Sequence, residues 1–216
     1  MRKIAVILSG CGFMDGSEIR ESVISLLAIE ENGAQYECFA IDKEQIDVVD
    51  HLNQEEGGKR NILVESARIA RGKIKALADL DANKFDVLHI PGGFGVAKNL
   101  SNFLDNGENY TVNKQIAQII KLFYQAKKPI CALCISPILL AGTLKGIKLT
   151  IGDNENIIKI INDRGNIHQT AAKGDVVIDA ENKIITTPCY MYDDIDLPTV
   201  HRAVDKAVKA SLTLIN

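Results

Sequence analysis

The chain lacks several features that would assign it to a common binding class. Among its 216 residues there is no tryptophan, aromatic residues make up only 5%, and no apolar stretch reaches the length of a membrane-spanning helix. The net charge is −3, and the Lys and Arg residues are scattered rather than gathered into a basic run. We therefore expect neither nucleic acid nor a membrane as a partner.

Motifs for binding phosphate or metal are also missing. No glycine-rich loop with a lysine follows the first apolar segment, and no paired aspartates suggest Mg²⁺. Cys131 and Cys134 form one CxxC pair, but no second pair and no nearby histidine completes a zinc site. The sequence thus predicts no metal and no organic cofactor, and Cys131 is interpreted as a strand residue.

Cysteine is sparse, with five residues, an odd number. The first apolar segment, residues 4–8, is too short for the core of a signal peptide and is better interpreted as a first strand. An odd number of thiols without an export signal favours reduced cysteines and a cytoplasmic location.

What is present is a regular alternation of short, uncharged apolar segments with amphipathic ones. It indicates an α/β fold with a mostly parallel sheet covered on both faces. Strands are predicted at residues 4–8, 36–41, 87–90, 129–133 and 149–152, and as a hairpin at 176–179 and 183–187. Helices are predicted after residue 17, at 62–71, 111–126, 135–144 and 157–161, and from 198 onward. Because no repeat or linker is visible, residues 1–216 are expected to form a single domain.

The first helix is predicted to begin with Ser17 as its N-cap. Four apolar side chains of this helix share one face and are predicted to be buried: Ile19, Val23, Leu26 and Leu27. Glu21 lies off that stripe, so the pattern alone makes it a solvated carboxylate. His89 falls within the strand at 87–90 and is interpreted as a packed core residue.

Cys134 lies at the junction of the strand at 129–133 and the helix at 135–144. A cysteine on such a turn faces the positive end of the helix dipole and nearby backbone N–H groups. That environment favours the thiolate and lowers a cysteine pKa from ~8.5 into the range ~3.5–7.5. We therefore expect Cys134 to be a nucleophile, the alternative being an inert buried thiol.

A glycine pair follows the strand at 87–90. Gly92 and Gly93 let the backbone approach a ligand closely. The N–H groups of Gly93 and Ile135 are predicted to form an oxyanion hole, although a tight turn alone would also explain the two glycines.

Two further strand ends are expected at the same crevice, since ligands of parallel sheets bind outside the carboxyl ends of the strands. Cys11 follows the first strand, and Cys189 and Tyr190 follow the hairpin. Both cysteines are expected to line the pocket, and Tyr190 to offer its hydroxyl to a substrate oxygen.

The order of the motifs resembles the ThiJ/PfpI superfamily. Three stretches carry the resemblance: Gly-Ser-Glu-Ile-Arg-Glu (16–21), His-Ile-Pro-Gly-Gly-Phe-Gly-Val-Ala-Lys-Asn-Leu (89–100) and Ile-Cys-Ala-Leu-Cys-Ile-Ser-Pro (130–137). Further stretches at 6–12, 61–72, 97–103 and 186–191 are similar to its ElbB branch, named for enhancing lycopene biosynthesis. The resemblance covers nearly the whole chain.

The resemblance implies a flavodoxin-like three-layer sandwich of the class I glutamine amidotransferase type, and a homodimer. It assigns the nucleophile to Cys134, the carboxylic acid bonded to it to Glu21, and the Pro-Gly-Gly turn to Gly92 and Gly93. The activity it implies is that of a glyoxalase-like enzyme, independent of glutathione and cofactors. Its substrate would be a small-molecule aldehyde, a dicarbonyl such as glyoxal or methylglyoxal, and its product a hydroxy acid.

A carboxyl group beside a thiol constrains the mechanism. An ionised Glu21 would repel the Cys134 thiolate and raise its pKa, whereas a protonated Glu21 could donate a hydrogen bond to the sulfur. The two groups would then share a proton and titrate as a unit. That arrangement suits addition of Cys134 to an aldehyde, giving a hemithioacetal, followed by proton transfer between adjacent carbons through Glu21.

Two other functions remain open. Hydrolytic members of the superfamily carry a histidine after the strand that follows the elbow, but here residues 149–152 are followed by Asp153, which disfavours a peptidase or an amidotransferase. A non-enzymatic redox sensor based on oxidation of Cys134 is the other alternative. Residues 43–80 are compatible with a pocket cover, an interface or plain surface.

Overall fold

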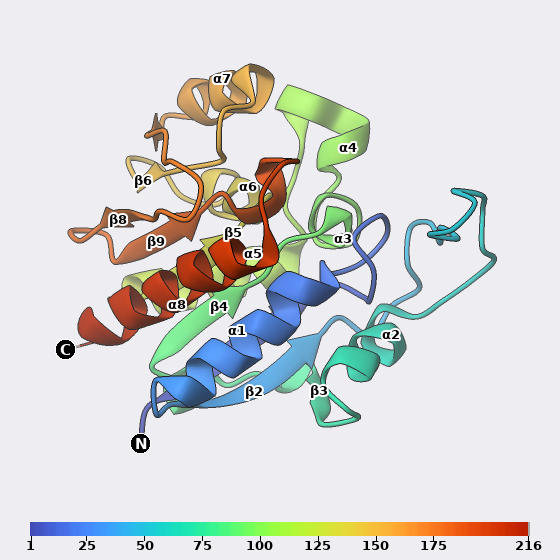
Figure 1. Ribbon diagram of the computed structural model, residues 1–216, viewed down its shortest axis with the longest axis horizontal. Helices are drawn as coiled ribbons and strands as arrows, with labels where there is room; N and C mark the ends of the chain where they lie inside the picture. Colours follow the sequence, from blue (N-terminus) through green and yellow to red (C-terminus); the bar gives the residue numbers. More distant parts are fainter. Residues whose placement is uncertain (216) are drawn as a thin grey trace.

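A seven-stranded sheet in the order β3-β2-β1-β4-β5-β9-β8 forms the centre of the computed structural model, which describes residues 1–215 (Figure 1). Its strands are β1 (Lys3–Leu8), β2 (Gln35–Ala40), β3 (Ile74–Ala76), β4 (Val87–Ile90), β5 (Ile130–Leu133), β8 (Val177–Asp179) and β9 (Ile184–Thr187). All neighbours are parallel except the hairpin of β8 with β9. A separate two-stranded sheet pairs β6 (Lys148–Leu149) with β7 (Ile167–His168).

Helices cover both faces of this sheet. They are α1 (Ile19–Glu31), α2 (Ile62–Ile69), α3 (Phe94–Lys98), α4 (Phe103–Asn106), α5 (Lys114–Gln125), α6 (Pro137–Ala141), α7 (Glu155–Asp163) and α8 (Leu197–Thr213). Short 3₁₀ turns occupy Leu77–Asp79, Ala82–Lys84, Gly107–Asn109 and Cys189–Met191. Helices α1 and α8 lie side by side on one face (Figure 1). Helix α1 connects β1 to β2, and α5 connects β4 to β5, so the two connections run in opposite directions along the sheet. Because both connections are right-handed, α5 lies on the face opposite to α1.

This arrangement is the flavodoxin-like three-layer sandwich predicted from the sequence, and the prediction is confirmed. Strands β4, β5 and β9 are buried along their whole length because helices cover them on both sides. Cys131 lies within β5, between His89 of β4 and Ile185 of β9. Its interpretation as a strand residue is therefore correct.

His89 is a core residue, as predicted. It is almost fully buried, and its Nε2 lies 2.8 Å from the Ser25 hydroxyl of α1. Burial lowers the pKa of His89 to about 4, so the imidazole is neutral at physiological pH. His89 therefore ties α1 to the centre of the sheet.

Of the four α1 side chains predicted to be buried, only Leu26 is buried, so the predicted face is wrong for the other three. Ile19, Val23 and Leu27 are 45%, 50% and 46% exposed, whereas Glu21 is fully buried. The helix instead packs through a face with small polar side chains, among them Ser22 and Ser25, which allow close approach to the sheet. The apolar stripe therefore did not identify the face of α1 that packs against the sheet, because the sequence does not show which surface the helix meets.

Several predicted boundaries also change. Ser17 does not cap α1: its hydroxyl accepts the Ser9 N–H at 2.8 Å, and Glu18 is the N-cap. The helix predicted at 135–144 contracts to α6, and the strand predicted at 149–152 is the two-residue β6, outside the main sheet. The short elements β3 and β7 carry too few residues for periodicity to detect.

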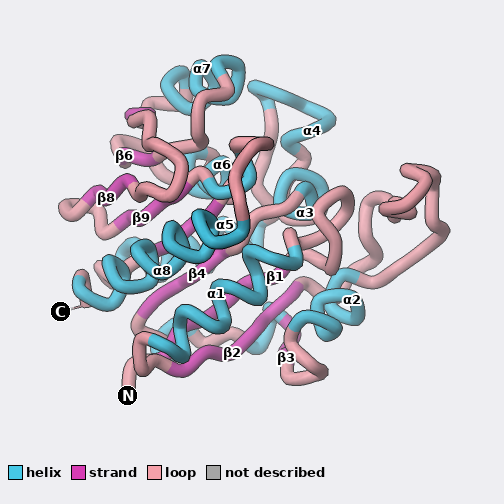
Figure 2. Tube along the Cα trace, viewed as in Figure 1, coloured by secondary structure: helices cyan, strands magenta, loops and turns pink. Residues whose placement is uncertain are grey.

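The topology places a crevice between β1 and β4. The chain leaves β1 toward β2 on one side and later returns to β4 on the other side, which makes this the switch point of the sheet. Figure 2 shows the connection between β2 and α2 as a long loop that projects from the body of the molecule.

Candidate active site

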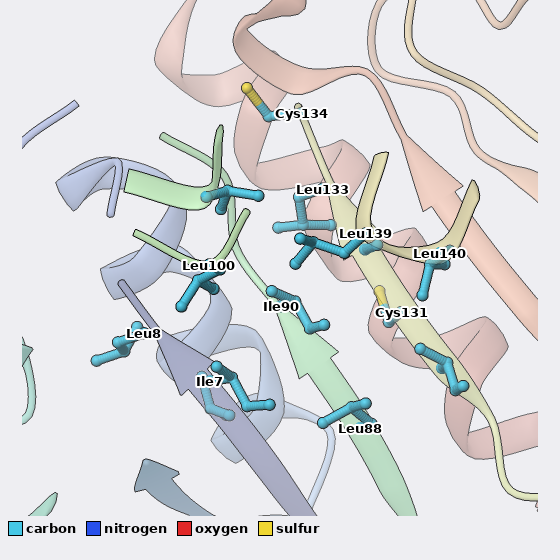
Figure 3. Close-up of a cluster of buried hydrophobic side chains, with 14 of the residues drawn as sticks. Ile7, Leu8, Leu88, Ile90, Leu100, Cys131, Leu133, Cys134, Leu139 and Leu140 are labelled. Carbon is cyan, nitrogen blue, oxygen red and sulfur yellow. The ribbon is translucent and has the colours of Figure 1, made fainter. Parts of the chain in front are cut away.

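Cys134 occupies a strained turn at the end of β5. Its backbone has φ +56°, a left-handed conformation that costs a residue other than glycine about 1–3 kcal/mol. Hydrogen bonds hold it there: its N–H donates to the Thr187 carbonyl at 2.9 Å, and the Ser136 hydroxyl donates to the Pro91 carbonyl at 2.6 Å. In Figure 3 the Cys134 sulfur lies beyond the apolar cluster, turned away from Leu133.

Glu21 lies against this cysteine, although the sequence pattern had placed it on the surface. Its carboxyl lies beside the Cys134 thiol, because a Cβ added at Gly92 would touch both groups, and each of the two acts on the pKa of the other. One carboxyl oxygen accepts the Gly92 N–H at 2.8 Å, and the other accepts the Tyr190 N–H at 3.2 Å. Burial, followed by the negative charge of Glu18, raises the pKa of Glu21 to about 8, so the carboxyl is mostly protonated at neutral pH.

The thiol responds to the same surroundings. Burial, followed by the charge of Glu21, raises the pKa of Cys134 well above its ordinary value, while the N–H groups of Gly93 and Ile135 act in the opposite direction. The expected lowering of this pKa is therefore wrong, because α6 is only a short helix and loss of solvent dominates. Cys134 and Glu21 form a coupled pair that holds its protons to alkaline pH.

Gly92 makes room for the pair. A Cβ atom added at Gly92 would lie 2.3 Å from the Cys134 Cβ and 2.6 Å from a Glu21 carboxyl oxygen. Even a methyl group must therefore push the thiol and the carboxyl apart. Gly92 has to be a glycine because the Cys134 side chain and the Glu21 carboxyl lie too close together to admit a Cβ between them.

For the glyoxalase-like reaction expected from the sequence, we expect Gly92→Ala to reduce kcat with glyoxal by at least about tenfold. It should also lower the free energy of unfolding by about 1–3 kcal/mol. Gly142→Ala is a matched control, because its Cβ would lie 2.7 Å from a Val112 methyl group, away from the pair. It should lower stability similarly and leave kcat of the folded protein unchanged. Equal losses of kcat in both variants would contradict the proposed role of Gly92.

Glu18 is a residue of the site that the sequence analysis missed. Its carboxylate caps α1 by accepting the Glu21 N–H at 2.6 Å, and its own N–H donates to the Gly92 carbonyl at 2.9 Å. A capping-box search would not have found this pair, because the N-cap is a Glu rather than Ser or Thr, and the Glu21 carboxyl accepts the Gly92 and Tyr190 N–H groups instead of the Glu18 N–H. Glu18 therefore orients Glu21 and also raises its pKa.

Glu18→Gln is expected to retain the cap through its amide oxygen while removing the charge. The pKa of Glu21 should then move down, and the acid limb of the pH–rate profile should move with it. The profile of Glu18→Ala shows whether loss of the cap alone, worth about 1 kcal/mol of stability, produces the same change. An unshifted profile for Glu18→Gln would show that the Glu18 charge does not act on Glu21.

The remaining predicted residues divide into two groups. Tyr190 contacts Glu21 through its backbone N–H, while its hydroxyl lies 3.4 Å from an Arg20 nitrogen. Cys189 is fully buried, and its pKa is raised well above the ordinary value by burial and then by the charges of Glu21 and Cys134. The structure thus brings Cys189 and Tyr190 to the pair.

The loop that carries Cys11 is bonded to α2, where the Gly10 N–H donates to the Ser66 hydroxyl at 2.9 Å. The Cys11 thiol is half-buried, and burial followed by the charge of Glu65 raises its pKa. Arg68, Asp15 and Arg60 also act on it, so the charged groups nearest to this thiol include two side chains of α2, Glu65 and Arg68.

No histidine among residues 1–215 is hydrogen-bonded to Cys134, and each has other partners. His51 accepts the Met14 N–H, His168 accepts the Ile151 N–H, and His201 pairs with Glu31. Over the same residues, no three His, Cys, Asp or Glu side chains are grouped to hold a metal ion, and no helix is long and apolar enough to cross a membrane.

A large hollow of the molecule does not contain the pair. It measures about 800 Å³ and lies around Lys3, Tyr36 and Lys75, at the edge where β1, β2 and β3 meet. A smaller pocket of about 480 Å³ has Glu18 and Tyr190 in its wall. Because Glu18 and Tyr190 both bond to Glu21, this smaller pocket adjoins the candidate site.

Comparisons with known proteins agree with this description. The family model described as DJ-1/PfpI family matches residues 13–188. The rat "ES1 protein homolog, mitochondrial" is 39% identical over 98% of this chain and 84% of its own length. The human "Glutamine amidotransferase-like class 1 domain-containing protein 3, mitochondrial" is 39% identical over 98% of this chain and 83% of its own length.

A solved structure from Ehrlichia chaffeensis, titled an isoprenoid biosynthesis protein with an amidotransferase-like domain, superposes with a TM-score of 0.92. It is 39% identical and covers 99% of both chains. The predicted superfamily and the class I glutamine amidotransferase-like fold are confirmed. The ElbB branch, the single domain over 1–216 and the homodimer stay predictions, as do the roles of the individual site residues.

Proposed function

Since the chain belongs to the DJ-1/PfpI family, we propose that it is a glyoxalase-like enzyme that converts small dicarbonyl aldehydes into hydroxy acids without glutathione. One observation carries the proposal: the buried thiol of Cys134 lies beside the Glu21 carboxyl, so that a Cβ at Gly92 would touch both, and this carboxyl keeps its proton to a pKa of about 8. A thiol and a proton-carrying carboxyl in contact are the two groups that this conversion requires.

The reaction begins from the pair with one proton, which the raised pKa of Cys134 places on the thiol; the Glu21 carboxylate takes this proton and leaves a thiolate. The sulfur adds to the aldehyde carbon, and Glu21 gives its proton to the aldehyde oxygen, which yields a hemithioacetal and a carboxylate. The N–H groups of Gly93 and Ile135, which act on the sulfur in the free protein, are close enough to the reacting atoms to stabilise oxygen charge.

Glu21 then acts as the proton shuttle. Its carboxylate removes the hydrogen from the carbon bonded to sulfur, giving an enediolate, and returns that proton to the adjacent carbon. The remaining hydroxyl proton moves between the two neighbouring oxygens, so the product is a thioester of a hydroxy acid. Glu21 next takes a proton from water, hydroxide adds to the thioester, and the Cys134 thiolate leaves as the hydroxy acid is released.

The structure disfavours the two alternatives. Burial raises the pKa of Cys134, which reduces the thiolate that a peroxide-sensing cysteine needs. A peptidase or amidotransferase needs a general acid for a leaving amine, and no histidine among the described residues is bonded to Cys134. The human relative's name contains the word amidotransferase, but that chemistry is not part of our proposal for this chain.

We propose a reducing compartment for the protein, because all five cysteines are free thiols. The cytoplasm expected from the sequence is one such compartment. The mitochondrial interior, named for the rat and human relatives, is another. Fractionation of the source cells, followed by detection of the protein with an antibody, distinguishes the two.

The function is tested by incubating purified protein with glyoxal, without glutathione or added metal, and measuring glycolate. Steady formation of glycolate over many turnovers supports the proposal. Consumption of only one glyoxal per chain, without formation of glycolate, would mean that Cys134 is merely modified by the aldehyde. That result would overturn the proposed function.

A further inference from the structure

The pair of Cys134 and Glu21 accounts for the reacting atoms of a substrate but not for the rest of the molecule. The adjoining pocket has a volume of about 480 Å³, which is within the range of ordinary ligand sites. This volume is far larger than a molecule of glyoxal requires. The wall of the pocket consists of Phe13, Glu18, Ile19, Arg20, His51, Tyr190 and Asp193. This set of residues is called the side pocket below.

The side pocket is joined to the reacting pair by two of its wall residues. Glu18 accepts the Glu21 N–H at 2.6 Å, and Tyr190 donates its own N–H to the Glu21 carboxyl at 3.2 Å. The side pocket therefore adjoins Glu21, the residue that lies beside Cys134.

Aromatic and apolar groups dominate the wall. The Phe13 and His51 rings meet edge to face with centroids 5.4 Å apart, and Tyr190 and Ile19 supply further apolar surface. Arg20 is solvent-exposed, and its guanidinium lies 3.4 Å from the Tyr190 hydroxyl. A guanidinium beside aromatic rings favours another flat ring by stacking.

The charges in the wall oppose an anionic substituent. Two carboxyl groups, Glu18 and Asp193, face one guanidinium, that of Arg20. Both ring nitrogens of His51 are engaged by the protein, since Nε2 lies 3.3 Å from the Met14 nitrogen and 3.9 Å from the Asp15 carboxylate, and Nδ1 lies 3.0 Å from the Val49 carbonyl oxygen. The best match is therefore an uncharged aromatic group.

The loop after β2 provides this wall through His51. The loop is anchored by its backbone, since the Val49 N–H donates to the Asp15 carboxylate at 2.8 Å. A second anchor is the ion pair of Lys98 with Asp47 at 2.7 Å. Gly12 leaves space for the ring, because a Cβ there would lie 2.5 Å from His51. Within residues 43–80, this part forms a wall of the pocket rather than plain surface.

We propose that the side pocket binds the non-reacting end of the substrate, and that the substrate class is 2-oxoaldehydes with an aromatic substituent. The inference rests on the proposed function and extends it to the substrate. For phenylglyoxal the overall reaction is the addition of one water: the aldehyde carbon becomes the carboxyl group and the ketone carbon becomes the carbinol of mandelate.

The first test compares kcat/KM for phenylglyoxal and glyoxal. We expect phenylglyoxal to be favoured by about 10-fold or more, and Phe13→Ala to reduce that preference by about tenfold with less than a twofold change for glyoxal. Phe94→Ala is the matched control: Phe94 is 43% exposed, as Phe13 is at 44%, but it is not in the wall. A preference that is absent, or that Phe94→Ala removes equally, overturns the inference.

The second test does not depend on turnover. Binding of mandelate and of glycolate, the two products, is measured by calorimetry on wild type, Phe13→Ala and Phe94→Ala. Tighter binding of mandelate that is lost only in Phe13→Ala supports the side pocket even if the wild type turns over neither aldehyde, in which case only the proposed function fails. Equal binding of the two acids overturns the side pocket, whatever the rates.

Discussion

Replacing Cys134 by alanine is expected to reduce the formation of glycolate from glyoxal by at least about 10³-fold, because the covalent hemithioacetal can no longer form. Cys189 is the other thiol beside Glu21. It is fully buried and therefore cannot reach the aldehyde in place of Cys134. Initial rates measured by chromatography of the acid product check the expectation. Intact-protein mass spectrometry under glyoxal should detect an adduct on wild type only.

Cys38→Ala is the matched control for this variant. Cys38 is also a buried thiol, but it lies in β2 on the far side of β1 from the pair, and burial raises its pKa to about 12. Its removal should leave the rate within about twofold of wild type, since surface and core changes away from the site act mainly on stability. Thermal unfolding of both variants separates loss of fold from loss of chemistry. Full activity of Cys134→Ala would exclude the covalent mechanism.

Glu21→Gln is expected to lower kcat by about 10²–10⁴-fold, because an amide cannot shuttle a proton. It should also abolish a pH dependence of stability. The unfolded chain releases the Glu21 proton near its ordinary value of 4.5, whereas the folded protein keeps it to about pH 8. The folded state therefore binds more protons in this interval, and its free energy of unfolding should fall by up to about 1.4 kcal/mol per pH unit as the pH rises toward 8.

The useful window for this measurement is pH 6.5 to 8. Below it His89, whose pKa is lowered to about 4, contributes a slope of the opposite sign, because it must be neutral to stay buried. Urea denaturation at several pH values gives the slope for wild type and for Glu21→Gln. Glu65→Gln is the control: Glu65 is a buried carboxyl that pairs with Arg60 and Arg68 instead of Cys134, so its variant should keep the slope. A slope unchanged in Glu21→Gln would contradict the raised pKa.

The sequence by itself determined the sheet and the position of the nucleophile. Uncharged apolar segments bounded by Gly and Pro can be buried only within a covered parallel sheet, so β1, β4 and β5 were predictable from local pattern. Cys134 was predictable for a related reason: it follows one such strand directly, and Gly92 and Gly93 follow another. Side chains that follow parallel strands lie at one edge because all such strands point the same way.

Only the tertiary structure decided the state of the site. The pKa of Cys134 depends on how much solvent the surrounding elements remove, and burial overrode the effect of a helix end. The place of Glu21 depends on which face of α1 meets the sheet, and that face combines Ser22 and Ser25 with apolar side chains such as Ile29. The side pocket depends on a loop brought to the site by contacts distant in sequence, such as Val49 with Asp15. Burial and long-range contacts are properties of the folded chain, and no local pattern contains them.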